Sequence, residues 1–291
     1  MNKKSWGLLF LLSLLWGSSF FFYKVLVAAL PPVTVVLGRV GIAAIALNLL
    51  LLVRGERLPA GRWKDFLVSG LLNNVFSFVL ICWGETRITS GMASILNATT
   101  PIFLVVVAHW ITHDEKLSWS KVAAITLGVV GTVILVGPQA FEGASAVMGE
   151  WAVIVASFFY AMGTLYSRHF RGLPPLVAAT GQLTAATVML LPLSLLVDHP
   201  WTLPLPGGQT WAALLVIALV NTAMAYIVYF KLLAGVGATH VSQVTFLIPP
   251  IAVLLGAVVL GESITLQAVS GMVVIGLGLA ALDGRLLKGK R

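Results

Sequence analysis

The sequence predicts an all-α integral membrane protein whose ten transmembrane helices form two inverted five-helix repeats. Three observations lead to this fold class. Of the 291 residues, 59% are hydrophobic and only 10% are charged, whereas soluble domains carry about 25% charged residues. The hydrophobic residues fall into runs that are long enough to cross a bilayer as helices. The second half of the chain also repeats residue types of the first half at a nearly constant separation.

The hydrophobic runs predict helices rather than barrel strands. They lack the period-two alternation of a membrane β-strand, and turn-forming residues such as Pro31, Pro32 and Pro138 separate them. In chain order, the predicted transmembrane helices are 6–29, 33–53, 65–83, 91–111, 118–137, 150–168, 174–197, 210–230, 239–260 and 264–283.

The positions of Lys and Arg orient these helices. Cytoplasmic loops of membrane proteins carry an excess of both residues, and fifteen of the eighteen fall on one predicted side. The opposite loops carry acidic residues, among them Glu85, and Arg87 is their only basic residue. Both termini are therefore predicted to be cytoplasmic. The same short clusters argue against a nucleic-acid partner, which needs a solvated basic face.

A repeat becomes visible when the chain is shifted against itself by about half its length. A compositional coincidence would match leucines and valines, but it does not account for matched Trp, Asn, Tyr and paired Pro residues. A shift of 148 pairs Trp63 with Trp211, Asn73 with Asn221, Ser94 with Ser242 and Pro101 with Pro249. A shift of 147 pairs Glu115 with Glu262, and one of 143 pairs Tyr23 with Tyr166, Pro31 with Pro174, Pro32 with Pro175 and Gly38 with Gly181.

The repeat predicts the domain organisation. We expect a first five-helix repeat at 1–137, a linker loop at 138–149, and a second repeat with a basic C-terminal tail at 150–291. Because five is odd, the second repeat must enter the bilayer upside down. Inverted repeats of this kind build transporters, whose substrate site lies near the midplane where the halves meet.

Several short motifs resemble the drug/metabolite transporter superfamily in its ten-helix EamA-type branch. The segment Trp16-Gly17-Ser18-Ser19-Phe20, with Pro31 and Arg39, resembles the opening of that family. The stretches from Pro101 to Glu115 and from Pro249 to Glu262 resemble its repeated ending.

The resemblance implies a multi-pass exporter of small metabolites in the bacterial inner membrane. It is nearest to exporters of aromatic amino acids of the YddG type, so aromatic and other neutral amino acids are the implied substrates. The four-helix multidrug relatives use a carboxylate in their first helix. Here that helix offers Ser13, Tyr23 and Lys24 but no acid, so the resemblance does not extend to their proton/drug exchange.

Amide side chains within the third and eighth helices are the first candidates for substrate binding. Asn73 and Asn74 lie in the third helix, and Asn221 lies at the matching place in the eighth. An amide in hydrocarbon is costly unless it finds partners, so these residues either bond neighbouring helices or bind substrate polar groups. Phe78 and Tyr226 are also matched, and they form either aromatic walls of a cavity or ordinary packing.

Polar residues beside prolines mark the fourth and ninth helices. Asn97 and Thr100 precede Pro101, and Gln243 precedes Pro249. Proline frees backbone carbonyls, which are tolerated at membrane depth only beside protein or a wet cavity. These residues therefore either line a cavity or form a gating kink without ligand contact.

Two aromatic residues complete the candidate site. Trp16 lies deep in the first helix and Tyr160 lies in the sixth, where each is either cavity lining or helix packing.

Two cations lie within hydrophobic spans and have open roles. Lys24 is near one helix end, where its side chain is expected to snorkel toward the interface. Arg39 lies about six residues into the second helix, where a charge is expensive and usually paired. It either holds a substrate carboxylate or caps carbonyls of a neighbouring helix. The second role is favoured because Gln182 replaces it in the second half.

The remaining chemistry points away from an enzyme. Neither the five His residues nor the single cysteine, Cys82, form a ligand set at metal spacing, so neither a metal nor a cofactor is predicted. No Asp or Glu lies clearly within a span, which favours a weakly coupled carrier that works by alternating access. The alternatives are a multidrug exporter and a proton-coupled antiporter. The expected partners are a small-molecule substrate and membrane lipid, with the chain as a monomer or homodimer.

Overall fold

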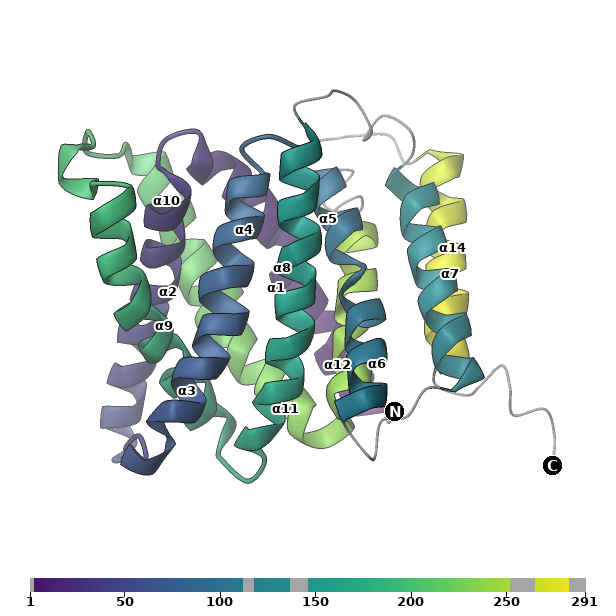
Figure 1. Cartoon of the computed structure of the whole chain (residues 1–291), viewed down its shortest axis with the longest axis horizontal. Coiled ribbons are helices and arrows are strands. Elements are labelled where there is room, and N and C mark those ends of the chain that lie inside the picture. Colours follow the sequence, from purple (N-terminus) through teal and green to yellow (C-terminus); the bar gives the residue numbers. More distant parts are fainter. Residues whose placement is uncertain (1–2, 112–117, 137–145, 252–264, 283–291) are drawn as a thin grey trace.

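The computed structural model describes residues 3–111, 118–136, 146–251 and 265–282. Most of the predicted linker, the second half of the predicted ninth helix and the basic tail lie outside the described residues, as do Glu115 and Glu262. Within the described ranges, helices account for nearly all of the chain, and their order follows the ten predicted segments (Figure 1).

The first half contains five helical runs, of which two are composite. They are α1 (Lys3–Val27); α2 (Pro32–Val53); a continuous run of η1 (Ala60–Arg62), α3 (Trp63–Gly70), the π-helix η2 (Leu71–Phe76) and α4 (Ser77–Gly84); the broken pair α5 (Ser90–Asn97) and α6 (Thr100–Ile111); and α7 (Trp119–Val136).

The second half follows the same plan over the residues that are described. Its runs are α8 (Ala146–Tyr166) with η4 (Ser167–Phe170); α9 (Pro175–Val197), followed by the short η5 (Pro200–Thr202); a continuous run of α10 (Gly208–Ala218), the π-helix η6 (Leu219–Met224) and α11 (Ala225–Val236); α12 (Ala238–Ser242) followed by the helix 244–251; and α14 (Leu266–Leu282).

Length and hydrophobic composition bear out the membrane class. In the described ranges, seven helices are long and apolar enough to cross a membrane, and shorter apolar helices lie at Trp119–Ile134 and Val269–Gly278. The prediction of an all-α membrane fold with about ten helices in two repeats is therefore confirmed.

The two π-helices show the repeat at the level of single residues. A shift of 148 places Leu71–Phe76 on Leu219–Met224, from the first residue to the last. At each segment one hydroxyl donates to the carbonyl five residues earlier: Ser77, which directly follows η2, to Leu72 at 2.7 Å, and Thr222 of η6 to Ile217 at 2.7 Å. A π-helix inserts an extra residue into a turn and frequently occurs at functional sites. Both halves therefore carry the same local distortion.

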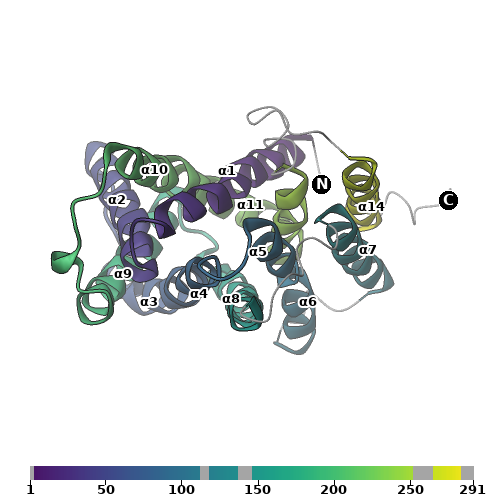
Figure 2. The same ribbon diagram turned by 90° about the horizontal axis from the view of Figure 1, so that it is seen from above.

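The two halves interlock instead of lying side by side as separate bundles. Gly38 in α2 lets Leu214 of α10 approach, and its matched residue Gly181 in α9 lets Phe66 of α3 approach. Phe66 and Leu214 are themselves matched by the shift of 148. Seen from above, α2 lies beside α10 and α9 lies beside α3 (Figure 2). The second helix of each half thus packs against the third helix of the other half.

Helices α7 and α14 form a separate pair at one side of the molecule (Figure 2). Small residues allow the two backbones to come close: an added Cβ on Gly131 would lie 2.7 Å from the nitrogen of Ile275, and one on Gly278 would lie 2.9 Å from the carbonyl oxygen of Ala124. Small-residue faces of this kind drive helix association in membranes.

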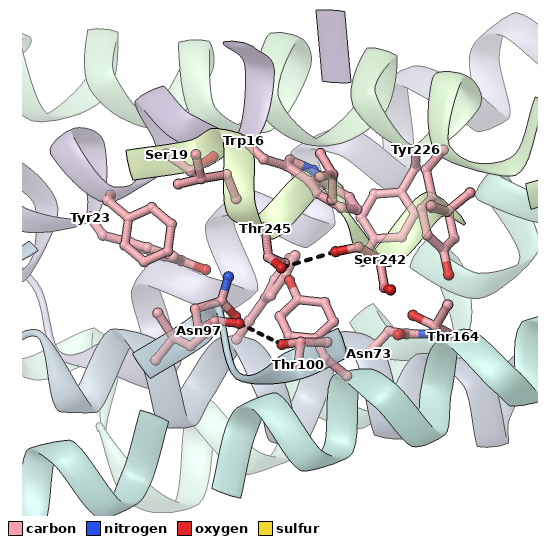
Figure 3. A pocket seen from close by; sticks show the side chains of 18 of the residues that line it. Trp16, Ser19, Tyr23, Asn73, Asn97, Thr100, Thr164, Tyr226, Ser242 and Thr245 are labelled. Carbon is pink, nitrogen blue, oxygen red and sulfur yellow. Dashed lines mark hydrogen bonds between the residues drawn. The ribbon is translucent and has the colours of Figure 1, made fainter. Parts of the chain in front are cut away.

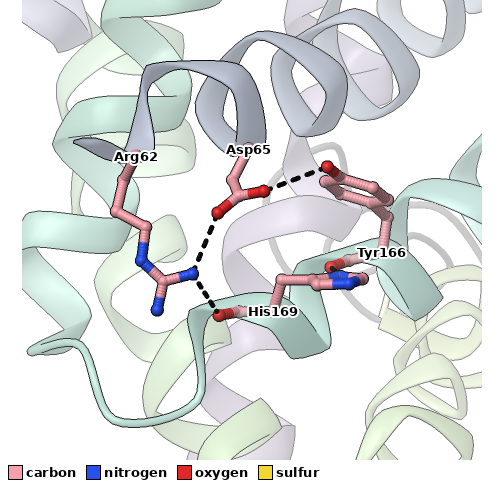
Figure 4. A network of polar contacts seen from close by, with 4 residues as sticks. All are labelled: Arg62, Asp65, Tyr166 and His169. Carbon is pink, nitrogen blue, oxygen red and sulfur yellow. Dashed lines mark hydrogen bonds and ion pairs between the residues drawn. The ribbon is translucent and has the colours of Figure 1, made fainter. Parts of the chain in front are cut away.

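Polar connections lie at the two ends of the bundle. The connections 54–62 and 171–174 lie at the lower end of Figure 1, and the connection 198–207 lies at the upper end. At the lower end, Arg62, Asp65, Tyr166 and His169 form a network between the first and second halves (Figure 4). Asp65 accepts from Arg62 at 2.9 Å and from the hydroxyl of Tyr166 at 3.1 Å, and Arg62 also reaches the carbonyl of His169 at 3.4 Å.

Candidate functional site

A cavity of about 50 Å³ lies where the two halves meet. Its lining residues include Asn73, Thr100 and Tyr226, which lie near the middle of the helical runs 60–84, 90–111 and 208–236. Both halves contribute nearly equal numbers of side chains. Its position, near the middle of the helices and between two inverted halves, is that of a transporter's substrate site.

Aromatic rings form much of the cavity wall. The ring of Trp16 lies 6.0 Å from that of Tyr226 and 5.6 Å from that of Tyr229, and Phe78 lies 5.9 Å from Tyr160 and 6.4 Å from Tyr226. Three of the four pairs are edge-to-face and the Trp16–Tyr229 pair is tilted; such contacts stabilise each other, so the wall is preorganised. Such a surface suits an apolar or aromatic group.

Helix breaks supply polar groups to the same cavity. The fourth run is interrupted between Asn97 and Thr100, as predicted, and the Thr100 hydroxyl donates to the Asn97 carbonyl at 2.7 Å. The ninth run is interrupted at Gln243, six residues before Pro249, and the Thr245 hydroxyl donates to the Ser242 carbonyl at 2.9 Å. Figure 3 shows both pairs among the side chains around the cavity.

Four buried polar atoms of the lining have no hydrogen-bond partner in the described part of the chain. They are Nε1 of Trp16, a donor; Oδ1 of Asn97, an acceptor; and the hydroxyls of Tyr23 and Tyr229. Buried polar groups are normally paired. A ligand with both acceptor and donor groups would satisfy such atoms.

Seven of the ten candidate residues line this cavity. They are Trp16, Asn73, Phe78, Asn97, Thr100, Tyr160 and Tyr226. Asn73 is partly engaged already, because its amide nitrogen lies 3.2 Å from the hydroxyls of both Ser69 and Ser167.

The other three candidates, Asn74, Asn221 and Gln243, are buried away from the cavity lining. The oxygen of Asn74 accepts from Gln182 at 2.7 Å and its nitrogen donates to the hydroxyl of Tyr226 at 2.8 Å. Asn221 donates to the Ser18 hydroxyl at 2.7 Å. Gln243 donates to the carbonyl of Thr239 at 3.3 Å. Asn74 and Asn221 thus bond other helices, which is the alternative that the sequence left open for them, whereas Gln243 bonds the preceding turn of its own helical run.

Several lining residues were not among the candidates. Ser19 and Tyr23 lie three and seven residues after Trp16, and Tyr229 lies three residues after Tyr226. Residues at these spacings share a helix face, so helical periodicity from the candidates could have found them. Thr164, Ser242 and Thr245 also line the cavity. Thr164 lies four residues after the candidate Tyr160.

Arg39 is the charged residue of the lining. It is 2% exposed, and its Nε donates to the Thr222 hydroxyl at 2.7 Å. Its Nη2 lies 3.3 Å from the Asn221 carbonyl and 3.5 Å from the Ser19 hydroxyl. Lys24, by contrast, is exposed and caps backbone carbonyls, those of Glu85 at 2.9 Å and Ile88 at 3.3 Å.

Glu85 lies in the turn after α4, as the sequence predicts, but its burial was not expected. It follows α4 directly and is 0% exposed, Oε1 has no partner in the described part of the chain, and Oε2 accepts only from Ser90 at 3.4 Å. Burial raises the pKa of this carboxyl well above its usual range, while the nearby ammonium of Lys24 lowers it. The sequence reasoning missed the burial because Gly84 and Glu85 resemble an ordinary helix end.

Within the described ranges, no group of three or more His, Cys, Asp or Glu residues could hold a metal ion. The cavity walls, the inverted halves and the two π-helices together define a multi-pass membrane transporter.

Comparison with known proteins identifies the family. The chain matches the EamA-like transporter family over residues 4–137 and again over 147–282, and it belongs to that family. The two matches fit the repeated architecture. Members of this family are transporters, so the chain is a transporter rather than an enzyme.

Individual relatives share only about a quarter of their residues with this chain. The chain is 27% identical to an uncharacterized inner membrane transporter of Escherichia coli K12, YedA, over 89% of this chain and 84% of that protein. It is 25% identical to a protein of Salmonella typhimurium named "Probable amino-acid metabolite efflux pump", over 96% of this chain and 94% of that protein. A solved crystal structure matches with a TM-score of 0.78 at 19% identity over 99% of both chains, which supports the fold.

Proposed function

We propose that this transporter exports small neutral metabolites, above all aromatic and other neutral amino acids, by alternating access of its two halves around the cavity. The observation that carries the proposal is the composition of the cavity wall. Seven aromatic side chains line the space, amide and hydroxyl groups occupy the helix breaks, and Arg39 is the one charged side chain among the lining residues. A zwitterion with an apolar side chain matches this surface.

The roles of the candidate residues follow from their positions. Trp16, Phe78, Tyr160 and Tyr226 enclose the substrate side chain. Asn73, Asn97 and Thr100 meet its polar groups. Asn74 and Asn221 support the walls through their bonds to other helices, and Gln243 supports the break of its own helical run. The relative from Salmonella typhimurium that is named for amino-acid metabolite efflux supports this substrate class.

We further propose that the chain lies in the bacterial inner membrane with both termini in the cytoplasm. The E. coli relative is named as an inner membrane transporter, and the basic connections 54–62 and 171–174 share one end of the bundle (Figure 1). A fluorescent protein fused after residue 291 tests the orientation. It is fluorescent in cells if the C-terminus is cytoplasmic, and dark if that terminus is exported unfolded.

Transport from proteoliposomes tests the substrate class. Vesicles loaded with phenylalanine, methionine or threonine should show saturable, protein-dependent efflux of at least one of them. Trp16→Ala should reduce that flux at least tenfold because it removes a cavity wall. Trp201→Ala, which removes an exposed Trp outside the cavity, should leave the flux unchanged. If none of the three amino acids moves faster than in protein-free vesicles, the amino-acid proposal is wrong.

The buried Glu85 favours a second candidate, a proton-coupled antiporter. A carboxyl that is fully buried without a salt bridge is held neutral more readily than one in water, so Glu85, at the end of the span Ala60–Gly84, would hold a proton when covered and release it when exposed to water. If this candidate is correct, a pH gradient across the vesicle accelerates flux and Glu85→Gln abolishes that acceleration. A gradient effect that survives Glu85→Gln excludes this residue. A multidrug exporter would instead be inhibited by lipophilic cations.

A further inference from the structure

Arg39 carries a buried positive charge that has no counter-ion in the described part of the chain. No carboxylate oxygen of the described residues lies within 4.0 Å of its side-chain nitrogens. The guanidinium carbon lies 4.0 Å from the ring centroid of Phe78 and 4.9 Å from that of Tyr23. These cation–π contacts offset part of the cost of burial. They do not supply the anion that a buried charge normally pairs with.

The matched residue of the other half shows what the structure itself requires at this place. Arg39 in α2 donates to Thr222 of the π-helix η6, and Gln182 in α9 donates to Asn74 of the π-helix η2, both at 2.7 Å. The shift of 143 pairs Arg39 with Gln182, and the shift of 148 pairs Thr222 with Asn74. A neutral amide pair therefore holds the second helix of one half to the π-helix of the other. The same connection at Arg39 therefore does not require a positive charge.

The guanidinium also keeps donors in reserve. Arginine has five N–H donors. Nε is used at 2.7 Å, the two bonds of Nη2 are long at 3.3 and 3.5 Å, and Nη1 has no hydrogen bond to any described residue. The side chain is 2% exposed and lines the cavity. A carboxylate in the cavity would receive the kind of charge-assisted hydrogen bonds that an arginine fork makes best.

We propose that Arg39 is the anion anchor of the cavity and that the transported molecule must carry a carboxylate. This inference rests on the proposed function only in placing the substrate in the cavity. The carboxylate lies against Arg39, and the remainder of the molecule lies against the aromatic wall of Trp16 and Tyr226. The amino group of an amino acid is not required by this contact, so a monocarboxylate of similar shape is also bound.

A panel of four inhibitors, phenylalanine and three of its analogues, tests the anchor in the wild-type protein. Labelled phenylalanine exchange is measured in proteoliposomes, with unlabelled phenylalanine, 3-phenylpropionate, phenylalaninamide or 2-phenylethylamine as the inhibitor. Phenylalanine and 3-phenylpropionate should inhibit. The other two lack the carboxylate and should inhibit at least about 30-fold more weakly, because the buried charge of Arg39 is left unpaired. Equal inhibition by phenylalanine and its amide would overturn the proposal.

A double variant isolates the charge from the structural role. Arg39→Gln with Thr222→Asn reproduces the Gln182–Asn74 pair, so the protein should fold while it loses its preference for carboxylates. Lys24→Gln removes a cation that lies outside the cavity lining and should leave that preference unchanged. Arg39→Lys keeps the charge and should retain part of the preference. A folded double variant that still discriminates at wild-type level would contradict the anchor.

A binding measurement separates this inference from the proposed function. If no amino acid is transported, the amino-acid proposal fails, but the anchor is still tested by the thermal shift of the purified wild-type protein. A shift with 3-phenylpropionate that is absent with 2-phenylethylamine supports the anchor. Equal shifts, or no shift with either compound, overturn it.

Discussion

The bond between Asn74 and Gln182 gives the most quantitative prediction for the interlocked halves. Both side chains are 0% exposed. Asn74→Ala removes two hydrogen bonds, the one received from Gln182 at 2.7 Å and the one donated to Tyr226 at 2.8 Å. Gln182→Ala removes the first of these and also the bond received from Ser69 at 2.6 Å. The double variant completes a thermodynamic cycle.

The expected magnitude follows from the number of bonds. Interhelical hydrogen bonds in membrane proteins contribute on average about 0.6 kcal/mol and at most about 1.7 kcal/mol. Two bonds therefore predict a loss of about 1–3 kcal/mol for Asn74→Ala. The coupling energy between the two positions reports one shared bond, so it should lie between about 0.6 and 1.7 kcal/mol.

Cys82 provides the assay. It is the single cysteine of the chain and is 0% exposed, so a thiol reagent reacts only when the structure opens. If the structure recloses faster than the thiol reacts, the labelling rate follows the free energy of opening. A loss of 1–3 kcal/mol then appears as a rate increase of about 5- to 150-fold. Gln209→Ala, which shortens an exposed amide, should change nothing. A coupling energy below about 0.3 kcal/mol would refute the reasoning.

Three further perturbations have defined outcomes. Asp198→Ala removes the acceptor that binds the first turn of α2 at 2.6 and 2.9 Å, and it should cost about 1–2 kcal/mol by Cys82 labelling; equal rates for the variant and the wild type would count against this cap. Burial raises the pKa of Glu85, so stability should be greatest at low pH and fall as pH rises through and above the ordinary carboxyl range. Glu85→Gln should reduce the change of the melting midpoint with pH between pH 5 and 8. An unchanged pH dependence in the variant would contradict this. Gly163→Ala would press a methyl group on Asn73 and cost about 1–3 kcal/mol, whereas Gly276→Ala meets open space and should be tolerated.

The large-scale organisation could be predicted because it depends on composition and repetition. Long hydrophobic runs specify membrane helices without further detail. The matched Asn73 and Asn221 lie at the same place in the two π-helices. The sequence repeat therefore marked both segments, although nothing in the residue types indicated a π-helix. That distortion depends on which carbonyl each turn can reach within the packed bundle. Pro101 likewise indicated the break of the fourth run, since proline cannot continue the hydrogen-bond ladder.

The side-chain roles could be predicted only in part, because direction and pairing depend on the other half. Asn73 and Asn74 are neighbours in the sequence, but one lines the cavity and the other bonds Gln182 of α9. The sequence alone identified Arg39 as a charge within a hydrophobic span. That it lies beside the cavity could be known only from the packing of α2 against η6 in the fold. Glu85 was expected in a polar loop, and only the fold shows that the chain covers it completely.

The cavity as the transport route is the central claim, and blocking it tests that claim most directly. Ser242 lines the cavity and is 4% exposed, so Ser242→Cys in a Cys82→Ala background places one reactive thiol there. Ser270→Cys, at an exposed position of α14, is the matched control. Phenylalanine should slow modification of the cavity thiol, and full modification with a bulky methanethiosulfonate should stop phenylalanine exchange, while the control is affected in neither way. Exchange at the wild-type rate after full modification of the cavity thiol would contradict the account.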